Sequence, residues 1–336
     1  MILISEMKTV TTDVPTNEAS TTRKMKSGFA FIVSHLDVQV ALPVSITPTL
    51  RLESASDAQI DEIRRFVSMG DGLSISYHYE HEWIAHAEHG TGHLVAQPLS
   101  RDRWRYFLIT WCNWNAEFLK FQKAVNLVPP GIFCYSAMIT DEDFGKGAVV
   151  GRHIEGTSIP AIYRQIPPTQ QIVDAERVEA WRRTFAALEQ FDAETHPGIA
   201  RAVDLFDRIN RLPLTDDFRV LGLFMTLEML LTHNPNGKEV GDSLSHQICT
   251  KVALLERRLT KPLNYAVLSD AKSDVVWKKL YAFRSAIAHG GVADFKGALR
   301  VLQSPQAATE FLTEATALIV RHALDEPALF DSLKPI

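Results

Sequence analysis

From residue 171 onward, the hydrophobic pattern of this chain is helical almost without interruption. Apolar side chains recur at spacings of three and four residues, as they do on the buried face of an amphipathic helix. Turns rich in Pro, Asn or Gly separate most of these segments, so the pattern predicts a bundle of helices around one core. The six expected helices cover residues 171–193, 198–211, 216–233, 243–259, 270–290 and 305–325.

The preceding residues are mixed and strand-rich. Apolar or alternating segments predict strands within residues 28–38, 43–53, 72–85 and 103–111. Pro48 cannot donate to a strand ladder, so its strand is expected to lie at a sheet edge or to break there. Ser56 and Gln59 form a capping-box pattern at the start of an expected helix, and a second helix is expected near residues 115–128. The fold class is therefore α+β, with a strand-rich N-terminal domain followed by an all-α bundle.

Three parts of the chain are expected from these patterns. Residues 1–26 are polar and rich in Thr and Ser, which is typical of a flexible arm. Residues 27–165 form a mixed α/β domain, and residues 171–330 form the helical bundle. A segment rich in Gly and Pro, residues 145–170, connects the two.

The composition narrows the class of protein. Hydrophobic residues make up 46% and charged residues 22%, as in globular proteins. The three cysteines are far apart, and no apolar run reaches the roughly 18 residues of a membrane helix. The first residues lack the pattern of a signal peptide, so a cytoplasmic protein with no membrane contact is expected.

Charge is distributed unevenly along the chain. The net charge of −5 argues against general coating of nucleic acid. Residues 251–300, however, hold ten Lys or Arg and four acids, a balance of 10 − 4 = +6. Such a block is either a solvated helix face or a cationic surface for a polyanion.

The expected helix at residues 270–290 carries the side chains best suited to binding and catalysis. Its apolar stripe is Val276, Leu280, Phe283 and Ile287. Off this stripe, Ser285 and His289 are four residues apart and share a face, whereas Arg284 and His289 lie roughly 140° apart around the helix. The structural alternative is an ordinary capped helix whose terminal His289 complements the helix dipole.

Glu228 lies in a helix, residues 216–233, that is apolar on nearly every side and is expected to be buried. A carboxylate in such a place is costly unless it is paired. Arg284 is the first candidate partner, and Lys251 or Arg257 are alternatives. The pair either holds two helices in register or orients an arginine that binds phosphate.

The segments LYAFRSAIAHGG and TLEMLLTH resemble the HEPN superfamily, and most closely its ApeA-like branch, over roughly residues 171–330. Arg284 and His289 match the superfamily signature of an Arg followed four to six residues later by a His. Ser285 stands at the intervening polar position, where Asn, Asp or His is common. The resemblance implies a metal-independent endoribonuclease without cofactors, often a toxin or an abortive-infection effector in antiviral defence that acts on tRNA or other RNA. Some relatives are non-catalytic modules that bind RNA or protein, or that dimerise.

RNA cleavage suits these residue types. RNA supplies its own nucleophile, the 2′-hydroxyl, so an enzyme needs proton transfer and stabilisation of the charged phosphorane. Histidine exchanges protons near neutral pH, and arginine matches phosphate geometry. The candidate catalytic residues are therefore Arg284, His289, Ser285 and Glu228. A two-fold homodimer through the 270–290 helix would place two such pairs in one cleft, and an antitoxin or a phage-derived trigger is a further expected partner.

One other cluster is rich in potential ligands. His78, His81, His86, His89 and His93 fall within 16 residues. Their spacing fits no recognised metal site, so a surface loop is expected there and no metal is predicted. A metal-dependent enzyme built on this cluster is the remaining alternative, besides a non-catalytic module with an N-terminal sensor domain.

Overall fold

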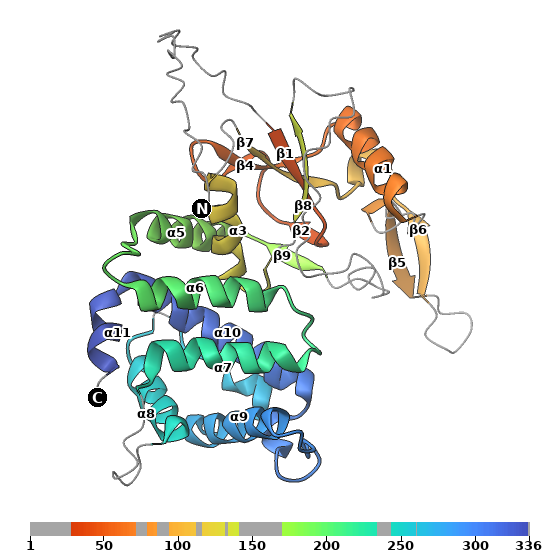
Figure 1. Cartoon of the computed structure of the whole chain (residues 1–336). Helices are drawn as coiled ribbons and strands as arrows, with labels where there is room; N and C mark the ends of the chain where they lie inside the picture. Colours follow the sequence, from red (N-terminus) through yellow and green to blue (C-terminus); the bar gives the residue numbers. More distant parts are fainter. Residues whose placement is uncertain are drawn as a thin grey trace, which may run out of the picture.

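The computed structural model describes residues 28–71, 79–85, 94–111, 116–131, 134–140, 170–233, 243–259 and 261–334. The arm expected at residues 1–26 and the connection at residues 145–169 lie outside the described residues. Within them, a small antiparallel sheet precedes a set of helices, which confirms the α+β class (Figure 1). None of the described helices is both long enough and apolar enough to cross a membrane.

The N-terminal sheet has five strands in the order β3-β4-β7-β1-β8, and every neighbouring pair is antiparallel. The strands are β1 (Gly28–Ile32), β3 (Val44–Ser45), β4 (Leu50–Ser54), β7 (Phe107–Trp111) and β8 (Cys134–Thr140). Pro48 falls between β3 and β4, and β3 is the edge strand, so both expectations for this proline are confirmed. Leu50 and Leu52 point into the core and are fully buried.

Helix α1 (Asp57–Asp71) begins with the predicted capping box. The backbone N–H of Ser56 donates to Oε1 of Gln59 at 2.8 Å, and the N–H of Gln59 donates to Oγ of Ser56 at 3.4 Å. These reciprocal bonds satisfy backbone donors that the first helical turn leaves open.

The strand expected at residues 72–85 is only partly present. Strand β5 (His81–Ala85) pairs antiparallel with β6 (Leu94–Pro98) in a separate two-stranded sheet. Tyr79 and Glu80 are helical instead of extended, and residues 72–78 lie outside the described part. Tyr79 is fully buried, and its hydroxyl donates to the carbonyl of Val33 at 2.7 Å, so this side chain anchors the hairpin to β1.

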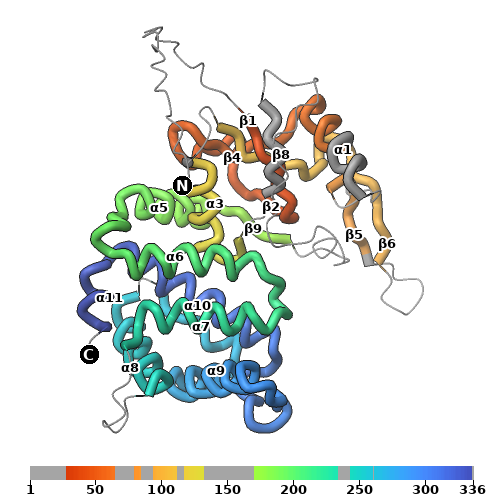
Figure 2. The backbone as a smooth tube through the Cα atoms, in the orientation of Figure 1, coloured from red at the N-terminus to blue at the C-terminus, as the bar shows by residue number. Residues whose placement is uncertain are grey.

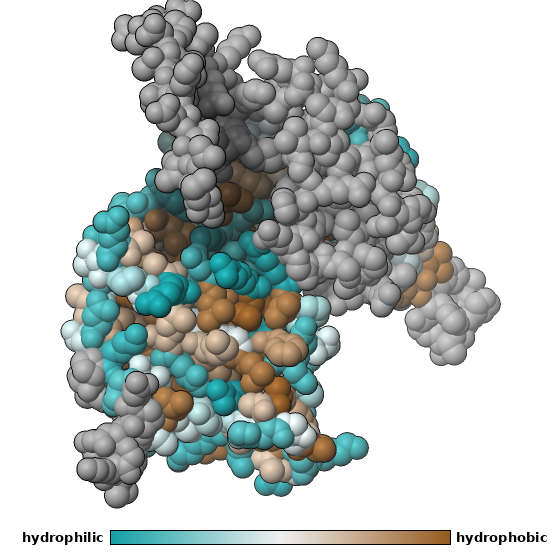
Figure 3. Space-filling view, viewed as in Figure 1, coloured by the Kyte–Doolittle hydropathy of each residue, from teal (hydrophilic) through white to brown (hydrophobic). Residues whose placement is uncertain are grey.

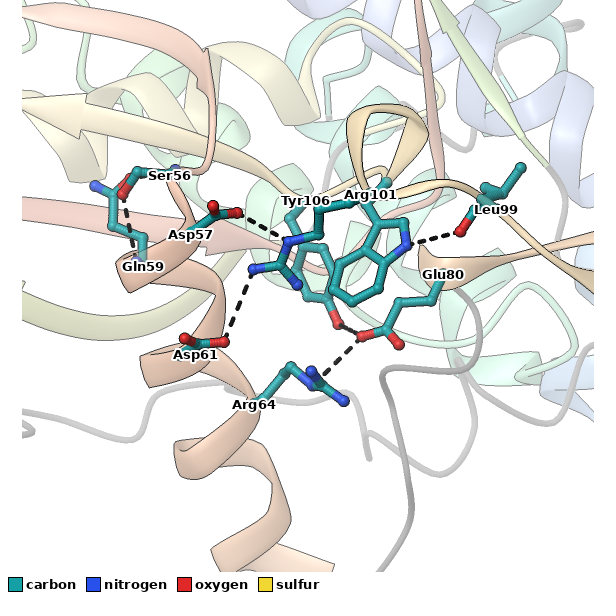
Figure 4. Close-up of polar contacts among 10 residues, drawn as sticks. Ser56, Asp57, Gln59, Asp61, Arg64, Glu80, Leu99, Arg101 and Tyr106 are labelled. Atoms are coloured by element: carbon teal, nitrogen blue, oxygen red, sulfur yellow. Dashed lines mark hydrogen bonds and ion pairs between the residues drawn. The ribbon is translucent and has the colours of Figure 1, made fainter.

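A polar cluster joins α1 to the loop before β7 (Figure 4). The guanidinium of Arg101 lies 4.0 Å from the ring centroid of Trp104, and that of Arg64 lies 5.6 Å from it. Asp57 accepts a hydrogen bond from Nε of Arg101 at 2.8 Å. The two arginines therefore interact with the Trp104 ring, and Arg101 also with a carboxylate of α1, so the cluster holds α1 against the sheet.

The helix expected at residues 171–193 begins later than predicted, at Ala175. Its first residues form strand β9 (Gln171–Val173), which pairs in parallel with β2 (Leu36–Val38). Helix α5 (Ala175–Gln190) then starts at Asp174, whose carboxylate accepts from the N–H of Arg177 at 2.8 Å. Pairing with a distant strand decides the conformation here, which local periodicity does not reveal.

Helix α5 contributes its core-facing side chains to the N-terminal part. Val178, Trp181 and Phe185 share one buried cluster with the β strands and with α3 (Ala116–Asn126). Figures 1 and 2 show α5 lying alongside α3. The sequence placed residues 171–193 in the helical bundle, whereas their most buried side chains belong to the neighbouring core. Nearer the end of the segment, Ala187 and Phe191 pack against the core of the bundle.

The second core belongs to the remaining helices. They are α6 (Pro197–Asn210), α7 (Asp217–Leu231), α8 (Leu244–Glu256), α9 (Ser273–Ala288), α10 (Pro305–Asp325) and α11 (Pro327–Leu333). Five of them match predicted helices to within a few residues at each end. Helix α11 was not predicted, because its seven residues are too few to show a helical period.

Helix α7 lies among α6, α8, α9, α10 and α11, and nine of its fifteen residues are buried, as expected. Val220, Leu223 and Leu227 are buried, whereas Phe218 is 72% exposed and Met225 52% exposed. These two side chains are apolar groups at the surface of α7, and apolar atoms gather over α6 and α7 in Figure 3.

Candidate functional site

The N-terminal half of α9 is tied down by apolar and polar contacts. Three of the four predicted stripe residues are at most 3% exposed, namely Val276, Leu280 and Phe283. Trp277 is also buried, and its Nε1 donates to the hydroxyl of Tyr265 at 3.0 Å. The hydroxyl of Ser273 donates to Oε1 of Glu256 at 2.9 Å, and the hydroxyl of Tyr265 also bonds to that carboxylate. The orientation of α9 is therefore fixed.

The C-terminal end of α9 is a Schellman motif. The N–H of Gly291 donates to the carbonyl of Ala286 at 2.8 Å, and the N–H of Gly290 donates to that of Ile287 at 3.2 Å. Gly290 has φ of +66°, a left-handed conformation in which glycine carries no Cβ penalty. His289 is the C-cap residue, and its side chain is exposed.

Arg284 and Glu228 form an ion pair between α9 and α7. Nη2 of Arg284 lies 3.5 Å from Oε1 of Glu228, and the two side chains are 24% and 18% exposed. Glu228 is thus paired with Arg284, the partner that was expected first. Of the two alternatives, Nζ of Lys251 donates to the carbonyl of Lys334 at 3.3 Å, and Arg257 is exposed.

This pair leaves hydrogen-bonding capacity unused. Oε1 of Glu228 and Nε of Arg284 are buried atoms without a hydrogen-bond partner among the described residues. Burial raises the pKa of the Glu228 carboxyl, and the charge of Arg284 opposes that rise only in part. The carboxylate therefore positions the guanidinium without saturating it.

Tyr281 is a third member of this group, and the sequence reasoning missed it. The guanidinium carbon of Arg284 lies 5.7 Å from the Tyr281 ring centroid, and Phe224 packs edge-on against the same ring at 5.6 Å. Burial, reinforced by the charge of Glu228, raises the pKa of the Tyr281 hydroxyl. Tyr281 lies three residues before Arg284, and residues at that spacing share a helix face. This spacing alone predicts a contact between the two side chains.

The other two candidate residues lie on a different face of α9. Val275, Lys278, Ala282, Ser285 and His289 recur at helical spacing; Ser285 is half-buried and the other four are exposed. Ser285 and His289 are joined by a backbone bond, from the N–H of His289 to the carbonyl of Ser285 at 3.1 Å. The described contacts include no side-chain contact between His289 and Arg284. The structure therefore pairs Arg284 with Glu228 and presents Ser285 and His289 outward.

The cationic block expected at residues 251–300 is largely at the surface. Seven of its ten Lys and Arg side chains are exposed, namely Arg257, Arg258, Lys261, Lys272, Lys278, Lys296 and Arg300. Arg258 pairs with Glu326 at 2.8 Å and Lys278 with Asp274 at 3.5 Å. Even with these pairs, the region around α9 offers exposed positive charge to a polyanion.

Within the residues that the structure describes, no group of three or more His, Cys, Asp or Glu side chains is placed to hold a metal ion. His81 lies in β5, and the other four histidines of the cluster, His78, His86, His89 and His93, lie outside the described residues. The metal-site alternative on that cluster stays a prediction.

Comparison with known proteins gives no match: no family model, no curated protein and no solved structure is significantly similar to this chain.

Proposed function

We propose that this protein is a metal-independent endoribonuclease of the HEPN type, which cleaves tRNA or other RNA through attack of the 2′-hydroxyl. The proposal rests on the resemblance of residues 280–291 and 226–233 to the ApeA-like branch of that superfamily. The observation that supports it best is the ion pair between Arg284 and Glu228. It holds a cation for phosphate close to the end of the helix that presents His289.

Each candidate residue has a role in this proposal. The guanidinium of Arg284 binds the scissile phosphate and stabilises the charge that grows on it. Glu228 on α7 and Tyr281 on α9 itself both contact that guanidinium and so position it. His289 takes or gives a proton from the exposed end of α9, and Ser285 lies beside it as a polar neighbour.

A homodimer completes the reaction. One His289 removes the proton of the 2′-hydroxyl, whose oxygen forms a bond to phosphorus. The partner subunit's His289 protonates the 5′-oxygen as its bond to phosphorus breaks, so a 2′,3′-cyclic phosphate and a 5′-hydroxyl result. The outward stripe of α9, from Val275 to His289, is the surface through which the two copies would meet.

The biological role follows from the same resemblance. An RNA-cleaving protein of this kind would act as a toxin or an abortive-infection effector in antiviral defence. An antitoxin or a phage-derived component would then control it.

The test is to incubate purified wild-type protein and the His289→Ala variant with total tRNA in EDTA and to identify the fragment ends. We expect cleavage by the wild type alone, leaving cyclic-phosphate ends. Equal cleavage by the variant, or loss of activity in EDTA, would contradict the proposal. Ala328→Glu, at an exposed position of α11, is the control for effects of substitution in general.

A second candidate function is a non-catalytic module that binds RNA or protein. It is favoured by the absence, among the described contacts, of any side-chain interaction between His289 and Arg284 or Ser285. In that case the pair of Arg284 with Glu228 serves to hold α7 and α9 in register. Tight binding of tRNA by both proteins of the assay above, with no cleavage by either, would favour this candidate.

A further inference from the structure

A cavity of about 660 Å³ lies where α5, α10 and the segment before α6 meet, away from the pair of Arg284 and Glu228. Its volume falls within the range of small-molecule sites. Its lining includes the apolar side chains Phe191, Leu259 and Leu318. It also includes cationic and titratable side chains from α5 and α10, among them Arg183, Arg321 and His322.

Arg321 is the central cation of this cavity. Its Nε is buried and has no hydrogen-bond partner among the described residues. Burial lowers the pKa of its guanidinium, the negative charge of Asp325 opposes that fall, and the positive charge of Arg183 adds to it. The open Nε of Arg321 is hydrogen-bonding capacity that an anion in the cavity would use.

His322 provides a second donor with unused capacity. Its residue is 8% exposed, and Nε2 has no hydrogen-bond partner among the described residues. The carboxylate oxygen of Glu326 lies 3.9 Å from this nitrogen, beyond hydrogen-bonding distance. A buried polar atom left open in this way is costly, and a ligand in the cavity would relieve that cost.

The carboxylates of the cavity do not neutralise these donors directly. Asp192 already accepts the backbone N–H groups of Glu194 at 3.0 Å and Thr195 at 3.1 Å, so it holds the turn before α6. Asp325 lies within electrostatic reach of Arg321 and Arg183, but the described ion pairs include none between it and either arginine. The open hydrogen-bonding groups of Arg321 and His322 therefore need a ligand that brings hydrogen-bond acceptors.

We propose that this cavity binds a small organic oxyanion. Its phosphate or carboxylate head would lie between Arg321 and Arg183 and accept from His322, and its apolar or aromatic body would lie against Phe191 and Leu318. Arginine forks match both kinds of head. This cavity lies apart from α9, and anion binding there does not depend on RNA cleavage.

The test uses matched pairs of anionic and neutral probes, titrated into the full chain by isothermal calorimetry. Adenosine 5′-monophosphate is compared with adenosine, and benzoate with benzamide. We expect at least one anion to bind saturably below about 1 mM while its neutral counterpart binds at least about tenfold more weakly. The pair that responds distinguishes a phosphate head from a carboxylate head. No saturable binding of either anion, or equal binding of anion and neutral counterpart, would overturn the proposal.

Two substitutions locate the binding. Arg321→Gln removes the cation with the open Nε, and Arg183→Glu reverses an exposed charge. Each should weaken anion binding by about tenfold or more, because each removes a charge-assisted contact. Arg208→Gln, at an exposed position of α6 outside the cavity, is the matched control and should bind as the wild type does. Unchanged binding in Arg183→Glu together with Arg321→Gln would place the anion elsewhere and refute this site.

Discussion

The guanidinium of Arg284 lies between a carboxylate on α7 and an aromatic ring on its own helix, Glu228 and Tyr281. Each contact is modest, since the ion pair is 3.5 Å long and the ring centroid 5.7 Å away. Together they restrict a long, flexible side chain to one region of the surface. Positioning of this kind, more than charge alone, is what a phosphate-binding arginine needs.

We expect Arg284→Lys to keep the positive charge but to lose the planar fork that matches phosphate. RNA cleavage should fall by about 10²–10³-fold, the usual cost of removing one donor to a developing charge. The readout is kcat/KM with a labelled tRNA, together with the melting temperature. Arg208→Lys, on the exposed face of α6, controls for the substitution itself. Full activity of Arg284→Lys would mean that only charge, and not geometry, is required.

Glu228 makes stability depend on pH. Its pKa is raised in the folded protein above the ordinary value of 4.5, so the folded state binds more protons than the unfolded state over a range that begins near that value. Stability therefore falls as pH rises through that range. Glu228→Gln removes this dependence, so the free energy of unfolding of the variant relative to wild type should increase as pH rises from 4.5. Urea denaturation at several pH values measures the difference, and a difference that shrinks with pH would contradict the assignment.

Among the elements, helices α6 and α7 pack closely against one another, and Gly222 makes this possible. A Cβ at this position would lie 2.2 Å from Cδ1 and 2.4 Å from Cγ1 of Ile209. Ile209 is β-branched and cannot move aside freely. The stiff Ile209 side chain and the missing Cβ of Gly222 thus set the distance between α6 and α7. The position of α7 in turn determines where Glu228 meets α9.

Gly222→Ala should destabilise the protein despite the better helix propensity of alanine. Overpacking costs about 1–3 kcal/mol, against about 1 kcal/mol gained from propensity. Gly198→Ala, in the first turn of α6, is the control, because its Cβ would meet nothing closer than Nζ of Lys334 at 3.6 Å. Guanidinium denaturation should show a loss for the first variant and none for the second. Equal stability of the two would show that Ile209 repacks without cost.

The bundle as a whole leaves some apolar side chains of α7 and small residues of α9 exposed. Phe218 and Met225 on α7 are more than half exposed, and α9 presents small residues such as Ala282 outward. The proposed RNA cleavage requires two copies of the chain to meet through the outward stripe of α9, since one chain supplies one His289. Catalysis and assembly are therefore expected to fail together.

We expect a mass of about twice 37.7 kDa in solution by light scattering. Ala282→Glu places a charge on the exposed stripe of α9 and should shift the protein toward the monomer and reduce RNA cleavage, with little change in melting temperature. Ala328→Glu on α11 makes the same change at an exposed position elsewhere and should leave the mass unchanged. A wild-type monomer that cleaves RNA at full rate would rule out the shared cleft.

The elements that the sequence predicted correctly are those with a strong local signal. The capping box at Ser56, the break at Pro48 and five of the bundle helices all follow from a few neighbouring residues. Arg284 was also the first partner expected for Glu228, because a carboxylate in an apolar helix needs a cation, with Lys251 and Arg257 as alternatives.

Other features depend on partners that are distant in the chain. Residues 171–173 form a strand because β2 lies beside them, and α5 joins the N-terminal core because its apolar face meets α3. The exposure of Phe218, the place of Tyr281 and the cavity between α5 and α10 likewise depend on how helices pack. The α+β class and most helix positions could be predicted from the chain, because periodicity and capping are local. Which helix faces are covered and which charges meet could not, because burial is a property of the assembled fold.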